Sequence, residues 1–158
     1  MTRIDLSVHE LLICKTLGIF RRTCASGNVV DRQVGKQDPW EIDIDGMVGE
    51  YCVAKWLNVF PDFTVSVRKG GIDLTSHSGK TIDVKTTRYK TGKLLATTSK
   101  INTACDIYVL AIVDDTGANI VGWASKEELL QDTNLIDLGH GKGFALEQSA
   151  LHKVLIDK

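Results

Sequence analysis

Residues 70–87 read GGIDLTSHSGKTIDVKTT, and this stretch decides how the fold is interpreted. Two runs rich in Ile, Leu, Val and Thr are interrupted by His-Ser-Gly at positions 77–79, which predicts two strands joined by a tight turn. In the second run, Asp83 and Lys85 alternate with apolar residues. Successive side chains of a strand point to opposite faces, so Asp83 and Lys85 are expected on the same face.

The length of the turn decides whether a second carboxylate faces Asp83. A three-residue turn places Ser76 opposite Lys80 and therefore Asp73 opposite Asp83, whereas a turn of two or four residues separates the two acids. Facing residues of an antiparallel pair have Cβ atoms about 4.5–5.5 Å apart, and like charges at that spacing destabilise the sheet. The pair therefore needs a cation, which is either Lys85 or a divalent metal ion such as Mg²⁺.

Length and composition predict a single domain over residues 1–158. The chain is 43% hydrophobic and 25% charged, which is ordinary for a soluble globular protein. No apolar run is long enough to span a bilayer and no secretory signal precedes the first predicted helix. We therefore expect a cytoplasmic protein without membrane contact. The sequence leaves open whether it forms a homo-oligomer.

The four cysteines lie 10, 28 and 53 residues apart without a C-x-x-C pair. This spacing fits neither the usual zinc sites nor a compact disulfide framework. The four histidines are equally scattered, so we expect them to be surface or packing residues.

Charge is distributed unevenly although the net charge is only −1. Residues 66–100 carry eight basic side chains against Asp73 and Asp83, a local charge of +6, and the rest of the chain carries −7. A positive field around two acids suits a site that holds a polyanion through a metal ion. The alternative for the peripheral lysines is a solvated, lysine-rich face.

Periodicity and turn signals predict an α/β (or α+β) domain with a mixed central sheet flanked by helices. Two helices come first, then the hairpin, then a nearly continuous apolar run typical of a central strand buried on both faces. The predicted elements are helices 4–22, 40–59 (beginning at Trp40 or Asp45) and 125–130; strands 63–67, 106–113, 119–124 and 144–147; and loops 23–39 and 86–103.

Glu50 is the unusual residue of the second predicted helix. It shares a helical stripe with the apolar residues three, four and seven positions further on, and a carboxylate aligned with an apolar face is costly to bury without a partner. Gly46 and Gly49 lower helix propensity but allow this end to approach another element closely. The alternative is that Glu50 lies at the exposed end of the stripe and has no function.

These residues together resemble the PD-(D/E)xK nuclease superfamily, in which a helix carrying Glu precedes a hairpin bearing Asp and (Asp/Glu)-x-Lys. The resemblance covers about Gly46 to Val113. The matching positions are Gly49-Glu50, Gly71-Ile72-Asp73 and Asp83-Val84-Lys85. Ile72 stands where the named pattern has Pro, and the third acid is Asp rather than the commoner Glu.

The resemblance implies a restriction-endonuclease-like core and a catalytic set of Glu50, Asp73, Asp83 and Lys85. Asp73 and Asp83 would bind Mg²⁺ (or Mn²⁺), joined by the Val84 carbonyl, and Glu50 would either complete the site or support its ligands. Lys85 would orient or deprotonate the attacking water, or stabilise the transition state. Basic and hydroxyl side chains around the hairpin would contact nucleic acid: Arg68, Lys69, Thr87, Arg88, Lys90 and Lys93.

The function expected from this resemblance is a Mg²⁺-dependent nuclease that hydrolyses phosphodiester bonds of DNA. The alternative is a catalytically inactive nuclease-fold protein that binds DNA or a protein partner. The structural alternative for the four residues is a surface hairpin with an Asp–Lys ion pair and no catalytic role. A small single core would suit a phage, mobile-element or repair setting.

Overall fold

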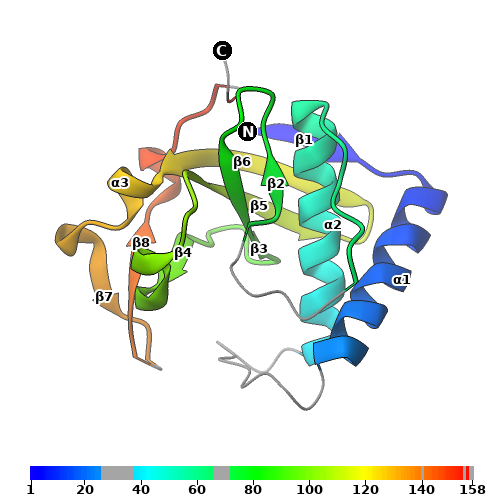
Figure 1. Cartoon of the computed structure of the whole chain (residues 1–158), viewed down its shortest axis with the longest axis horizontal. Coiled ribbons are helices and arrows are strands. Elements are labelled where there is room, and N and C mark those ends of the chain that lie inside the picture. Colours follow the sequence, from blue (N-terminus) through cyan, green and yellow to red (C-terminus); the bar gives the residue numbers. More distant parts are fainter. Residues whose placement is uncertain (26–37, 66–71, 140, 155, 157–158) are drawn as a thin grey trace.

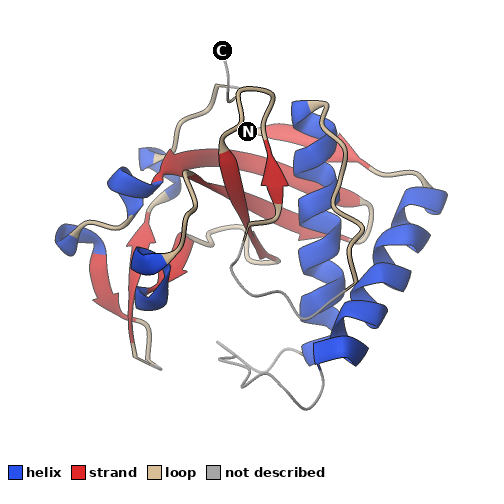
Figure 2. Ribbon diagram, viewed as in Figure 1, coloured by secondary structure: helices blue, strands red, loops and turns tan. Residues whose placement is uncertain are grey.

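The computed structural model describes residues 1–25, 38–65, 72–139, 141–154 and 156 (Figure 1). One strand and two long helices come first and most of the strands follow them along the chain; Figure 2 shows the strands crossing the middle of the molecule. The elements are β1 (Thr2–Asp5), α1 (Val8–Ala25), α2 (Pro39–Leu57), β2 (Leu74–Thr75), β3 (Thr81–Thr87), β4 (Leu94–Thr97), η1 (Thr98–Asn102), β5 (Ile107–Asp114), β6 (Gly117–Ser125), α3 (Lys126–Leu129), η2 (Asp132–Asn134), β7 (Leu135–Asp137), β8 (Lys142–Leu146) and η3 (Gln148–Ala150).

The central sheet has five strands in the order β1-β6-β5-β3-β2. Only β3 and β5 pair in parallel, and the other neighbours are antiparallel, so the sheet is mixed, as the sequence predicts. β5 is buried along its length except at Asp114, which confirms the prediction of a central strand covered on both faces.

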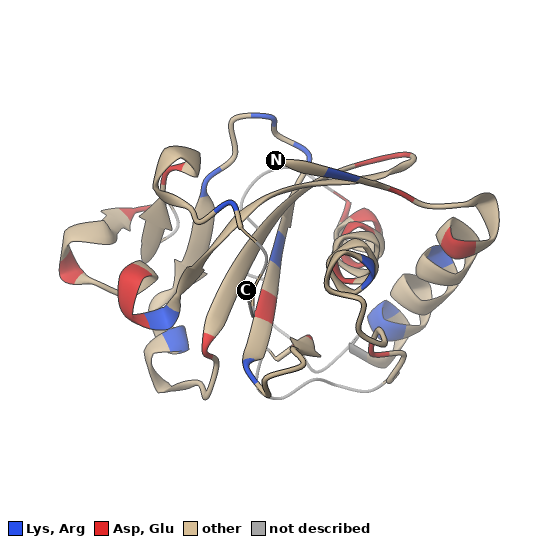
Figure 3. Ribbon diagram, turned by 90° about the horizontal axis from the view of Figure 1, so that it is seen from above, with Lys and Arg blue, Asp and Glu red and all other residues tan. Residues whose placement is uncertain are grey.

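Different layers cover the two faces of this sheet. Helices α1 and α2 pack on one face, where α2 contributes more buried side chains than α1. The small sheet β4-β8-β7 and the short helix α3 cover the other face. Figure 3 shows the long helices on one side of the sheet and the short strands on the other. The expected mixed sheet flanked by helices is therefore present, with the two long helices on one face and the short helix α3 on the other.

Local signals give several element boundaries correctly. Ser7 and Glu10 exchange the two hydrogen bonds of a capping box at the start of α1. Ser125 and Glu128 do the same at α3. Asp38 accepts a hydrogen bond from the Trp40 N–H at the start of α2. Helix ends with a capping signal are thus the reliable part of the sequence interpretation.

Two predictions of local structure are wrong, and one is tested only in part. The helix expected from Ile4 begins at Val8, because residues 2–5 instead form the edge strand β1 that pairs with β6. The loop expected over residues 86–103 contains β4 and η1, because β4 pairs with the distant strand β8. In the strand expected over 63–67, residues 63–65 are not in a strand, and 66–67 lie outside the described residues.

The hairpin has the predicted register. The Ser76 N–H donates to the Lys80 carbonyl over 2.9 Å, and Gly79 adopts a φ of 85°, which favours glycine in this turn. Leu74 pairs with Ile82 and Thr75 with Thr81, as a three-residue turn requires. The geometry around Asp73 and Asp83 therefore follows from the turn read in the sequence.

Candidate active site

Asp83 and Lys85 lie on the face of β3 that is turned away from helices α1 and α2. Their neighbours across the parallel ladder are Tyr108 and Leu110 of β5, which belong to the core beneath the small sheet. The Asp83 side chain is only 2% exposed, and the Lys85 ammonium lies 2.5 Å from its Oδ1 atom. The shared face predicted from alternation is confirmed, and Lys85 is one cation beside the carboxylate.

A second ammonium reaches Asp83 from η1. Lys100 Nζ lies 2.6 Å from Asp83 Oδ2, and its side chain is 15% exposed. At this distance Lys100 and Asp83 form a close ion pair, which is the polar contact that the described residues give to Oδ2. Each oxygen of the buried carboxylate thus has its own ammonium, and the group of three carries a formal charge of +1.

Asp73 lies beside Asp83 at the edge of the sheet. Its N–H donates to the Ile82 carbonyl over 2.8 Å, and its Oδ2 atom accepts the N–H of Val84 over 2.8 Å. These two hydrogen bonds of Asp73 join it to the two residues that flank Asp83. β2 begins only at Leu74, so it does not extend along β3 as far as Val84. The Asp73 carboxylate accepts the Val84 N–H there, in place of the backbone carbonyl that a longer strand would supply.

Asp73 also borders a surface depression. An open pocket of about 420 Å³ lies between residues 59–62 and the start of β2, and its polar side chains include Asp62 and Asp73. The two acidic residues thus lie at the rim of one pocket on the hairpin side of the molecule.

Glu50 is placed on the other side of the sheet. It is largely buried in α2, the helix that packs against the face of β3 opposite Asp83. Its Oε2 atom accepts a hydrogen bond from Arg21 over 2.7 Å, and both side chains are 11% exposed. Arg21 also donates to the Asp62 and Thr64 carbonyls. Glu50 thus pairs through α1 with the segment that borders the Asp73 pocket.

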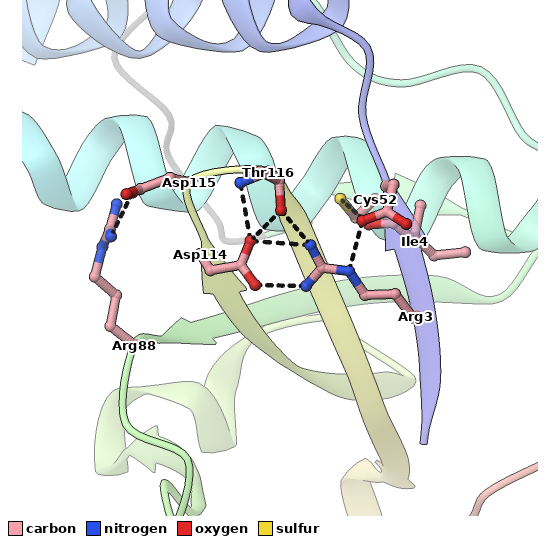
Figure 4. Close-up of polar contacts among 8 residues, drawn as sticks. Arg3, Ile4, Cys52, Arg88, Asp114, Asp115 and Thr116 are labelled. Carbon is pink, nitrogen blue, oxygen red and sulfur yellow. Dashed lines mark hydrogen bonds and ion pairs between the residues drawn. The ribbon is translucent and has the colours of Figure 1, made fainter.

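The residues expected to bind nucleic acid have different surroundings. Arg88 forms two hydrogen bonds to the buried carboxylate of Asp45 and a third to Asp115, the contact drawn in Figure 4. Thr87 accepts the Tyr89 N–H, which folds the chain back after β3. The Arg88 guanidinium is thus used to join β3, α2 and the β5–β6 turn.

The lysines of the following loop remain at the surface. Lys90 is exposed, and Lys93 pairs with Glu147 over 2.6 Å. Gln148 donates to the carbonyls of Lys90 and Gly92, which fixes the path of the loop. Arg68 and Lys69 lie outside the described residues.

Two polar side chains near Asp83 are not predicted as site residues from the sequence. Lys100 belongs to a basic segment read as irregular, and no local pattern links it to a carboxylate 17 positions earlier. Tyr108 lies in the apolar run that predicts the strand 106–113, yet its buried hydroxyl has no hydrogen-bond partner within the described part of the chain. Burial raises the pKa of Tyr108 to about 12, so this phenol stays protonated at neutral pH.

Among the described residues, no group of three His, Cys, Asp or Glu side chains is arranged to hold a metal ion. The same part of the chain contains no helix that could cross a membrane. Comparison of the chain with protein-family models, with curated proteins and with solved structures gives no match in any of the three.

Proposed function

We propose that this chain is a Mg²⁺-dependent nuclease that hydrolyses phosphodiester bonds of DNA. The observation that carries the proposal is the junction of β2 and β3. There Asp73 contacts the residues on both sides of Asp83, and Lys85 lies 2.5 Å from the buried Asp83 carboxylate. In chain order, α2 with Glu50, this hairpin and the buried strand β5 also follow the arrangement that the resemblance implies.

The donor set fits a hard divalent cation. Asp83 Oδ2 is a buried carboxylate oxygen that lacks a hydrogen-bond partner among the described residues and already attracts an ammonium. Mg²⁺ is commonly bound through one or two carboxylates together with phosphate oxygens, so two aspartates are a sufficient protein contribution. Asp73 and Asp83 would hold the ion. The Val84 carbonyl would join them, because a strand residue directs its N–H and C=O to the same side and the Val84 N–H faces Asp73.

Different residues of the chain would contribute to different parts of phosphodiester hydrolysis. When bound, a divalent ion lowers the pKa of a coordinated water and neutralises charge on the phosphate oxygens. The Lys85 Nζ atom, held beside Asp83, would orient or deprotonate the attacking water, or would stabilise the charge that develops on the phosphate. Lys90 and Lys93 supply exposed positive charge beyond the end of β3 for contact with the nucleic-acid backbone.

We propose a structural role for Arg88 and a positioning role for Glu50. Arg88 donates to Asp45 and Asp115, which occupies its guanidinium within the protein. Glu50 holds Arg21, and Arg21 holds the carbonyls of residues 62 and 64 near Asp73. Glu50 would therefore act on the site through Arg21 rather than through a metal bond.

A catalytically inactive protein that uses the same hairpin to bind DNA is the second candidate. The observation that favours it is the separation of the acids, since Glu50 pairs with Arg21 on the opposite side of the sheet from Asp83. Such a protein would keep the Asp83–Lys85 ion pair for the stability of the hairpin.

The deciding experiment incubates the protein with supercoiled plasmid and with labelled single-stranded DNA in Mg²⁺, Mn²⁺ or EDTA. We expect cleavage that requires metal and that falls about 10²–10⁴-fold in Asp83→Asn and in Lys85→Met. Lys85→Met removes one of the two partners of the buried Asp83 carboxylate, so thermal unfolding of both site variants shows how much of each loss comes from stability. Lys15→Gln, an exposed position on α1, is the matched control for loss of one positive charge.

Three outcomes contradict the nuclease. These are cleavage that persists in EDTA, cleavage that both site variants retain, and retention of DNA without any cleavage. The last outcome supports the binding protein instead.

Variants of the Glu50–Arg21 pair test how Glu50 acts. If Glu50 positions the segment at residues 62–64, Glu50→Gln and Arg21→Met should lower cleavage by similar factors and leave the metal concentration for half-maximal cleavage unchanged. A metal ligand would behave differently, because only Glu50→Gln would then raise that concentration. Thermal unfolding of both variants reports how much of each loss comes from stability.

A further inference from the structure

We propose that Lys100 is a resident counter-ion of Asp83 that leaves this carboxylate when nucleic acid binds, so that the site takes up its metal with the nucleic acid rather than before it. The inference rests on the proposed nuclease function. It adds a role for Lys100, a residue that neither the motif nor the resemblance includes. We call this role a gate, because Lys100 occupies the Asp83 carboxylate until nucleic acid binds.

The first argument is the geometry of the three charges. Lys85 and Lys100 hold different oxygens of Asp83, at 2.5 and 2.6 Å. A divalent ion that binds either oxygen meets an ammonium already at contact distance. Like charges at such separations repel strongly in a site that is largely shielded from water, so one ammonium has to move before the ion can bind.

The second argument is that Lys100 is the ammonium that can move. Lys100 belongs to η1, a five-residue 3₁₀ helix whose first turn has no side-chain cap, and such short helices have poor hydrogen-bond geometry. Lys85, in contrast, belongs to the seven-residue strand β3, where it pairs with Leu110 of β5. A lysine on a flexible four-carbon stem can turn from a carboxylate to a nearby phosphate with small backbone changes.

The third argument concerns charge balance. Asp83 with its two lysines carries +1, and the neighbouring Asp73 brings the local charge to zero, so the free protein has no net negative charge there to attract a cation, whereas a phosphate diester adds the negative charge that the site lacks. Once Lys100 pairs with a phosphate, Asp83 and Asp73 face the ion with one ammonium fewer. Metal and nucleic acid therefore favour each other's binding, as linkage requires.

The test measures Mn²⁺ binding to the free protein by electron paramagnetic resonance. We expect Lys100→Met, which keeps an unbranched apolar stem, to bind Mn²⁺ at least about tenfold more tightly than the wild-type chain. Lys100→Arg keeps the charge and should bind like the wild type, as should Lys15→Gln. Adding Asp83→Asn to Lys100→Met should abolish the gain, because the new affinity belongs to that carboxylate.

A second measurement follows Lys100 to the phosphate. Anisotropy of a labelled DNA duplex in EDTA should show weaker binding by Lys100→Met. The slope of log affinity against log salt should also fall by about one unit, as expected for one lost phosphate contact. Lys100→Gln serves if the Met variant fails to fold, since it removes the same charge and keeps a polar end.

The results separate failure of this inference from failure of the proposed function. If Asp83→Asn abolishes cleavage while Lys100→Met leaves Mn²⁺ affinity unchanged, Lys100 is only a structural partner of Asp83 and the gate is wrong. An affinity gain that survives Asp83→Asn, or an unchanged salt slope, also overturns it. If cleavage persists in Asp83→Asn, the nuclease site itself is wrong, whatever Lys100 does.

Discussion

Two glycines of α2 make the packing of this helix against β3 testable. A Cβ atom added at Gly49 would lie 2.1 Å from Thr86 Cγ2, whereas one added at Gly46 would meet nothing within 4 Å. The sequence suggested that both glycines allow close approach, and the structure gives that role to Gly49 alone. The variants Gly49→Ala and Gly46→Ala therefore add the same methyl group to one helix in two different surroundings.

The size of the effect follows from the contact. The tightest ordinary separation is 3.4 Å, so Gly49→Ala must move Thr86 or the helix by about 1.3 Å, the difference from 2.1 Å. Overpacking of this kind costs about 1–3 kcal/mol. Replacing Gly by Ala within a helix gains about 0.5–1 kcal/mol at either position. Gly46→Ala should therefore raise the free energy of unfolding. The free energy of unfolding of Gly49→Ala should be about 1–3 kcal/mol lower than that of Gly46→Ala.

Urea unfolding followed by circular dichroism measures these free energies, and Thr86→Ser supplies the control. Serine removes the Cγ2 atom but keeps the hydroxyl, so Gly49→Ala should cost less in the Thr86→Ser background. The coupling energy from the double-mutant cycle should exceed about 0.5 kcal/mol. Equal stability of the two alanine variants, or a cost of Gly49→Ala that is the same in both backgrounds, would refute the packing described for Gly49.

Three further predictions concern charges and thiols. Arg88→Met leaves the buried Asp45 carboxylate without its main partner; because the Arg88 side chain is 43% exposed, we expect a loss of about 1–2 kcal/mol in urea unfolding, part of which Asp45→Asn should restore. Hydrogen bonds from Arg3 hold the pKa of Asp114 well below its usual range, so their contribution is present above about pH 4 and is lost as the pH falls. The stability difference between wild type and Arg3→Met, about 0.5–1 kcal/mol near neutral pH after screening, should shrink towards pH 2, and an unchanged difference would contradict this pairing. Cys24 is the only exposed cysteine, so a thiol reagent should titrate one group in the native protein and four after unfolding; more than one native equivalent would contradict the burial of the others.

The sequence predicts those features whose partners are close along the chain. The hairpin register depends on a turn of three residues, and the helix caps depend on pairs three residues apart. Asp83 and Lys85 share a face because alternation within a strand is a local property. These features could therefore be read without knowing how the rest of the chain folds.

Features that depend on distant partners were missed. β1 pairs with β6, more than a hundred residues further on, so the local pattern around Ile4 resembled the start of a helix. Arg21 and Glu50 are 29 residues apart, and the stripe on α2 shows only that Glu50 needs a partner, not which residue supplies it. Lys100 reaches Asp83 from a segment whose composition is merely basic. Tertiary packing decides all three placements.

The charge arrangement at Asp83 is itself an argument that the site is functional. Burying a carboxylate is costly, and replacing a buried ion pair by apolar residues of similar volume is often neutral or stabilising, so such groups are weak evidence for stability. A core position on β3 that only had to support the fold would be filled more simply by an apolar side chain, as at Ile82 and Val84. Asp83 instead has a 2% exposed side chain and two lysines from different elements. This arrangement places two ammonium groups near the edge of the sheet where β2 does not extend along β3 and the Asp73 carboxylate contacts Val84 instead. In the proposed nuclease, a phosphate and its cation would have to meet at this edge.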